Sequence, residues 1–136
     1  MMMNAVVFAQ ATHTLDFETP NTGSGWSWTG FEFAPTITEM ANPVSGGINT
    51  SATVMEFIAH ATDQPWVGCW TMDDGEFTFD ATNSIVKIMV YKPVISNVGI
   101  KFEGMSAPAE ILIPNTVTNA WEEITYDFSA FIGSTF

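Results

Sequence analysis

Two tryptophans separated by one residue are the feature of this sequence that points most directly to a chemistry. Trp26 and Trp28 stand in the stretch GWSWTGFEF, directly after a glycine-rich turn. Alternate residues of an extended chain share one face, so both indole rings would lie on the same side. Exposed tryptophan rings at a loop end stack on the apolar faces of sugar rings. The spacing predicts a glycan-stacking pair, with the alternative that one or both rings cap the core.

Acidic residues gather at the ends of expected strands and suggest a cation site. Asp16 and Glu18 stand near the start of the chain and Asp127 near its end. If the first and last strands meet, these three carboxylates would supply oxygen ligands to one Ca²⁺, which takes about six to eight of them. The run DDGE at residues 73–76 is typical of a solvated turn instead.

No set of residues typical of catalysis is recognisable. The two histidines, His13 and His60, have no nucleophile or metal-ligand spacing beside them. A glycosidase needs two carboxylates facing each other across a cleft, and the 15 Asp and Glu residues stand in no such motif. The single cysteine, Cys69, lies in an acidic stretch that favours a small buried hydrophobic residue over a reactive thiol. We therefore expect that the protein is not an enzyme.

Composition limits the partners of the chain. Its 136 residues suit one domain, 46% of them are hydrophobic, and only 13% are charged, against about 25% in typical soluble domains. A surface built from Thr, Ser, Asn and Gly suits a secreted β-protein. A net charge of −12 excludes nucleic acid and disfavours anionic membranes, and the apolar runs are too short for membrane insertion. Neutral ligands and divalent cations are favoured.

The elements that must position these residues are all expected to be strands. Short runs of β-branched and aromatic residues alternate with clusters of Gly, Pro, Asn and Asp, and no stretch has helical apolar spacing. A strand about every ten residues predicts an all-β fold, an antiparallel β-sandwich of jelly-roll type. Strands are expected at residues 4–9, 14–17, 30–33, 36–40, 52–60, 66–71, 76–80, 84–92, 98–103, 110–113 and 121–128.

Two of these segments show the period of two clearly. In residues 84–92, alternation directs Val86, Ile88 and Val90 toward the core. Residues 121–128 alternate likewise, with one apolar side formed by Ile124, Tyr126 and Phe128.

The stretch QPWVGCW is interpreted mainly as core. Trp66 and Trp70 would share a face with Gly68 between them. A glycine in a strand permits close approach of another backbone or side chain.

Five stretches carry a resemblance to a known kind of module. In order they are DFE, NPVSGGINTSATVMEF, PWVGCW, IVKIMVYKP and AWEEITYDFS. Together they resemble a secreted β-sandwich module of Bacteroidetes-type bacteria that is similar to carbohydrate-binding modules, over roughly residues 15–136. The resemblance implies a jelly-roll, secretion and no catalysis. In similar calcium-bearing sandwiches the ion lies where the first and last strands meet, which corresponds here to Asp16, Glu18 and Asp127.

The two ends of the chain depart from that pattern. Similar modules continue after a segment such as ITYDFSAFIGSTF with closing strands, so the domain of residues 11–136 is expected to have open edges and an exposed core. Residues 1–10 form an uncharged apolar arm that includes Val6, Val7 and Phe8. The arm would either fold back as a closing strand or enter the next subunit as a donated strand. Head-to-tail donation that does not close a ring makes a filament.

Two functions follow from these observations. The first is a non-catalytic extracellular structural protein, similar to a carbohydrate-binding module, that self-assembles by strand exchange into a fibre of a surface or matrix layer. The alternative is a monomeric carbohydrate-binding module that recognises a neutral polysaccharide through Trp26 and Trp28. Loss of the tryptophans would abolish binding in the alternative. Loss of residues 1–10 would end assembly in the first.

Overall fold

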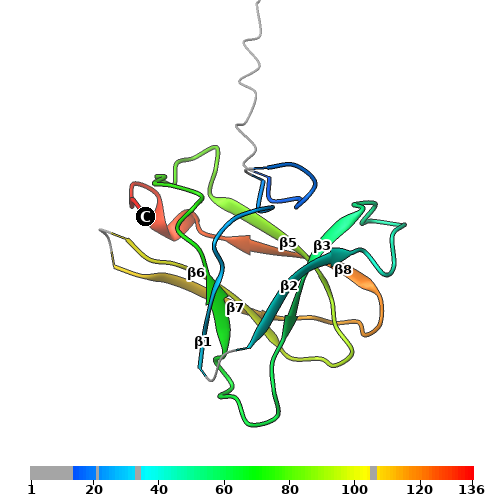
Figure 1. Ribbon diagram of the computed structural model, residues 1–136. Helices are drawn as coiled ribbons and strands as arrows, with labels where there is room; N and C mark the ends of the chain where they lie inside the picture. Colours follow the sequence, from blue (N-terminus) through cyan, green and yellow to red (C-terminus); the bar gives the residue numbers. More distant parts are fainter. Residues whose placement is uncertain (1–13, 21, 33–34, 105–106) are drawn as a thin grey trace, which may run out of the picture. The chain divides into compact units, whose positions relative to one another are not determined.

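The computed structural model describes residues 14–20, 22–32, 35–104 and 107–136, and its regular elements are eight strands and one short 3₁₀ helix. The all-β class predicted from the sequence is confirmed. The described residues form two compact units, Thr14–Glu76 and Phe77–Phe136, called here the N-terminal and C-terminal units. Each unit contains four of the strands, all paired in antiparallel fashion (Figure 1). No helix among the described residues is long and apolar enough to cross a membrane.

The N-terminal unit consists of two strand pairs. β1 (Thr29–Phe31) pairs with β4 (Gly68–Trp70), and β2 (Thr36–Ala41) pairs with β3 (Thr53–Ile58). The connection between β2 and β3 is closed by backbone hydrogen bonds, including one of 2.7 Å from Asn42 N–H to the Ala52 carbonyl. These pairs match four of the expected strands, with the ends moved by a few residues.

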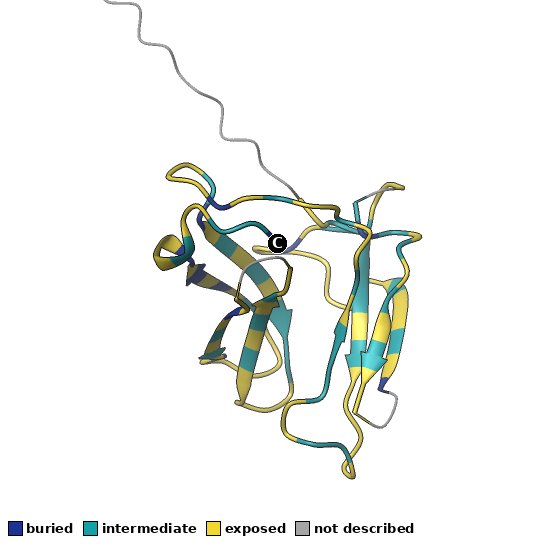
Figure 2. Cartoon of the chain, turned by 90° about the vertical axis from the view of Figure 1, so that its left-hand side faces the viewer, coloured by how far each residue is buried: buried dark blue, intermediate teal, exposed yellow. Residues whose placement is uncertain are grey.

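The C-terminal unit also consists of two strand pairs, of which β5–β8, with seven residue pairs, is longer than any other described ladder. β5 (Ile85–Tyr91) pairs with β8 (Trp121–Asp127), and β6 (Asn97–Phe102) pairs with β7 (Ala109–Pro114). The period of two in β5 and β8 is confirmed, because their inward residues are buried or half-buried and alternate with exposed ones (Figure 2). Six buried apolar side chains form the core: Phe79, Ala109, Ile124, Tyr126, Phe128 and Phe136.

Aromatic rings dominate this core. The Phe79 and Phe128 rings stack with their centroids 5.2 Å apart and their planes 9° apart, and Phe102 meets both of them edge-on. Such offset and edge-to-face pairs stabilise beyond their buried area. Tyr126 keeps its hydroxyl satisfied in the core by donating to the Val98 carbonyl at 2.9 Å.

The C-terminal residues are part of the packed structure. Phe77 and Phe136 exchange two backbone hydrogen bonds of 2.9 Å each, and Phe79 N–H donates to the Ser134 carbonyl at 3.2 Å. The strand expected at residues 76–80 is thus reduced to a short pairing with the end of the chain, centred on a bridge between Thr78 and Thr135. The apolar ring of Phe136 is 8% exposed.

The strand expected at residues 14–17 is wrong. Asp16 N–H and Phe17 N–H both donate to the Thr22 carbonyl, at 3.0 and 2.9 Å, so the chain turns back on itself. Phe17 has a φ of 59°, which is incompatible with an extended strand. The expected strand at residues 4–9 and the arm of residues 1–10, with Val6, Val7 and Phe8, lie outside the described residues.

The prediction that Trp66 and Trp70 belong mainly to the core is also wrong. Their exposed fractions are 62% and 49%. Trp66 stands in the turn before β4, where Val67 N–H donates to the Gln64 carbonyl, and the half-buried residue at the centre of β4 is Cys69. Burial raises the pKa of the Cys69 thiol, so the view of Cys69 as an unreactive apolar residue fits its place.

Candidate functional site

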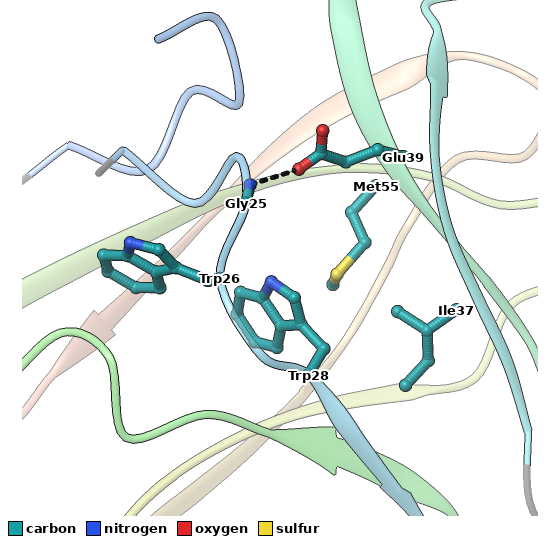
Figure 3. A pocket seen from close by; sticks show the side chains of 6 residues that line it. All are labelled: Gly25, Trp26, Trp28, Ile37, Glu39 and Met55. Carbon is teal, nitrogen blue, oxygen red and sulfur yellow. Dashed lines mark hydrogen bonds between the residues drawn. The ribbon is translucent and has the colours of Figure 1, made fainter. Parts of the chain in front are cut away.

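A hollow of about 390 Å³ lies in the N-terminal unit beside the two tryptophans predicted to bind glycan (Figure 3). Its walls come from the segment before β1 and from one face of the β2–β3 pair. The residues that line it are Gly25, Trp26, Trp28, Ile37, Glu39 and Met55.

The structure brings the two indole rings together. The centroids of Trp26 and Trp28 are 6.2 Å apart and the ring planes differ by 28°, so the rings lie nearly parallel. Trp28 donates its indole N–H to the Gly23 carbonyl at 3.4 Å and packs against Phe17 at a centroid distance of 6.2 Å. These two contacts fix the position of the Trp28 ring. Trp26 lies beside it and adds to the same aromatic surface.

The loop of residues 16–23 positions Phe17, the ring on which Trp28 packs. The Asp16 carboxylate accepts hydrogen bonds from the Thr22 hydroxyl at 2.5 Å and from Glu18 N–H at 3.0 Å, and the Thr22 bond is the larger cause of the lowered pKa of Asp16. The resulting turn directs the Phe17 ring against Gly23, where a Cβ atom would lie 2.8 Å from the ring. Gly23 also has a φ of 98°, so this position requires glycine.

Glu39 is the polar group of the hollow. Its two carboxylate oxygens accept hydrogen bonds of 3.1 Å each, one from the Ser24 hydroxyl and one from Gly25 N–H (Figure 3). These bonds fix the carboxylate, and each oxygen keeps a further lone pair for a ligand hydroxyl. Glu39 pairs across the ladder with Met55 and stands two residues from Ile37, which explains why all three line the same space.

The sequence analysis did not identify Glu39. The sequence signal that could have identified it is its position in the segment TITEM, because the alternation of a strand places the Glu39 carboxylate on the same face as Ile37. A charged residue on the same face of a strand as an apolar residue indicates a face that is partly packed and partly exposed to solvent.

The three carboxylates expected to bind calcium have separate roles in the structure. Glu18 in the N-terminal unit accepts from Thr53 N–H at 2.8 Å and ties the loop to β3. Asp127 in the C-terminal unit accepts from Ser129 N–H at 2.8 Å at the start of the 3₁₀ helix, and hydrogen bonds from the Ser129 hydroxyl and N–H lower its pKa. Asp16 closes its own loop. Within the described ranges, no three His, Cys, Asp or Glu side chains lie together as metal ligands. Calcium binding stays a prediction.

No family model matches the chain, and neither a curated protein nor a solved structure is significantly similar to it. The case for a function rests on the hollow itself.

Proposed function

We propose that this protein is a non-catalytic extracellular module that binds a neutral polysaccharide through Trp26 and Trp28. The observation that carries the proposal is the nearly parallel pair of rings in a hollow with a fixed carboxylate at its edge. The apolar face of a sugar ring fits an aromatic surface, and its hydroxyl groups donate to a carboxylate.

The negative charge of the protein favours a neutral ligand. The chain has a net charge of −12, and Glu39 adds a carboxylate at the binding position. A uronate or sulfate group placed against Glu39 would meet a group of like charge, which is unfavourable. Polysaccharides without acidic groups are therefore the expected class.

The test is affinity electrophoresis in native gels that contain glucans, mannans, xylans or galactans, with alginate and a sulfated galactan as anionic controls. Trp28→Ala and Trp26→Ala should each weaken binding to the retained polysaccharide by about 30-fold, because truncating a central aromatic contact costs about 2 kcal/mol. Trp66→Ala is the matched control, since this exposed tryptophan is not part of the lining. Equal retardation of Trp28→Ala and the native chain would refute the proposal.

Self-assembly by strand exchange is the second candidate. The observation that favours it is that the described strands form ladders of only two strands each, and such a ladder can be extended by a further strand. Free edges accept an added strand, and the uncharged segment of residues 1–10 is suited to provide one.

Light scattering and negative-stain microscopy test this second function. Long particles that disappear when residues 1–10 are deleted, and that persist in Trp26→Ala/Trp28→Ala, would support donated-strand assembly. A monomer of 14.9 kDa with and without these residues would rule it out. The two functions thus have separate readouts.

A further inference from the structure

A second aromatic surface lies on the outer face of the β1–β4 pair. Thr29 faces Trp70 across this ladder, and Phe31 faces Gly68. Residues directly opposite each other in an antiparallel pair point to the same side, so these four share a face. Burial agrees with this assignment, because Phe31 and Trp70 are exposed by 41% and 49% while the central Gly30 and Cys69 are half-buried.

Gly68 determines the form of this face. The outer atoms of the Phe31 ring occupy the space where a Gly68 Cβ would stand, with Cζ 2.5 Å and Cε1 2.9 Å from that position. The Phe31 ring therefore lies across β4 instead of beside a neighbouring side chain. Trp70 follows two residues later on the same strand, which places a second exposed ring on the same face.

A hydrogen bond next to the β1–β4 pair holds the two strands together at the end where β1 begins and β4 ends. Asp73, just after β4, accepts a hydrogen bond from Ser27 N–H, just before β1, at 2.5 Å. This contact joins the two strands beyond their ladder. The face is therefore preorganised, which reduces the entropy lost when a ligand binds.

We propose that Phe31 and Trp70 form a second saccharide-stacking site, separate from the hollow and sharing no residue with its lining. The inference rests on the proposed function and adds to it that the N-terminal unit is bivalent. Two sites on one unit raise the apparent affinity for a polymer and allow one molecule to join two polysaccharide chains.

Size and charge favour a sugar over a second copy of the protein as occupant. Two paired strands of three residues each extend about 10 Å along the chain and lie about 5 Å apart. This area is far below the roughly 800 Å² per partner of a stable protein interface. The four residues of the face are uncharged, whereas Glu32, Asp73 and Asp74 stand nearby in a chain of net charge −12. A neutral ring ligand fits such a face better than another copy of an acidic chain.

The test is calorimetry with a short neutral oligosaccharide cut from the polysaccharide that the native protein retains in gels. The native chain should bind about two molecules, and Trp70→Ala and Trp26→Ala/Trp28→Ala about one each, because each change removes one site. Ile48→Ala is the control, since this aliphatic residue has a similar exposure of 54% and lies outside both surfaces. Turbidity of the native protein with the long polymer should likewise be lost in Trp70→Ala.

Two results would overturn the inference. Binding of one molecule by the native chain, lost in Trp26→Ala/Trp28→Ala and unchanged in Trp70→Ala, would leave the proposed function intact and remove the second site. A native chain that is dimeric in sedimentation and becomes monomeric in Trp70→Ala, with its sugar binding unaltered, would assign the face to self-association. Absence of any oligosaccharide binding would refute the proposed function, and the second site with it.

Discussion

The two units of the chain differ in where they keep their aromatic side chains. In the C-terminal unit the rings of Phe79, Phe128 and Phe136 are buried together in one cluster. In the N-terminal unit no described aromatic ring is buried: Phe31, Trp66 and Trp70 are exposed, and Trp26 and Trp28 are half-buried. All six residues of the buried hydrophobic core cluster belong to residues 77–136. Burial of aromatic area stabilises the C-terminal unit, whereas the N-terminal unit leaves aromatic area in contact with solvent, which is the basis of the proposed ligand binding.

The N-terminal unit replaces a large apolar core with polar contacts between loops. Glu18 to Thr53, Glu39 to Gly25 and Ser27 to Asp73 each join a loop to a distant segment through a backbone N–H. Each such contact contributes at most about 1 kcal/mol, because all three are exposed to solvent. A unit held in this way is expected to open locally at lower free energy than the C-terminal ladders.

The largest expected effect is in the aromatic core of the C-terminal unit. Phe128→Ala removes a fully buried ring that stacks on Phe79 and should lower the free energy of unfolding by about 3–5 kcal/mol. Urea denaturation followed by circular dichroism measures this change. Trp66→Ala in the N-terminal unit is the control and should stay within about 0.5 kcal/mol. Similar losses in the two variants would contradict the contrast between the units.

A smaller effect is expected from a change in the loop next to the proposed glycan-binding hollow. Gly23→Ala forces a side chain into a backbone with φ of 98° and against the Phe17 ring, which costs about 1–3 kcal/mol of local strain. Because Phe17 packs on Trp28, the shift should reach the binding surface and weaken polysaccharide binding.

Gly47→Ala is the matched comparison for this variant. Gly47 lies in the same unit but outside the lining of the hollow, and it also has a positive φ, of 61°, with no atom within 4 Å of its Cβ position. It should therefore show strain without displacement of Phe17. If Gly23→Ala binds polysaccharide as tightly as Gly47→Ala does, the loop does not position Trp28.

The difference between the units also explains what the sequence could predict. In β5 and β8 the side chains themselves carry the period of two, so the inward positions of Val86, Ile88 and Tyr126 could be read directly. The turn at Phe17 depends on its contacts with Thr22 and Gly23. These contacts form only when the loop closes, so no pattern in the neighbouring sequence predicts them.

The same reason accounts for the error at Trp70. Apolar character predicts burial only where a partner layer covers the residue. The β1–β4 ladder is three residues long and leaves its outer face exposed. Whether another layer packs on this face decides the burial of Trp70, and the sequence around Trp70 does not reveal which face is covered.

The smallest effect is a dependence of the N-terminal unit on pH. Hydrogen bonds from the Thr22 hydroxyl and Glu18 N–H hold the pKa of Asp16 below its ordinary value of 3.8. The folded loop therefore favours the ionised carboxylate. Its stabilising contribution is complete above the unfolded pKa and is lost as the pH falls through the lower folded value.

Tryptophan fluorescence can measure this loss, because four of the five tryptophans belong to the N-terminal unit and Trp28 rests on the ring of Phe17. The signal should change in the acid range below about pH 4, and the change should be absent in Asp16→Asn. Asp80→Asn is the control, since the pKa of Asp80 is also lowered by hydrogen bonds from a threonine, Thr82, but in the C-terminal unit. An acid transition that survives in Asp16→Asn and disappears in Asp80→Asn would show that the aromatic surface depends on the C-terminal unit. The binding surface would then share the cooperative stability of the core, and the two units would unfold as one.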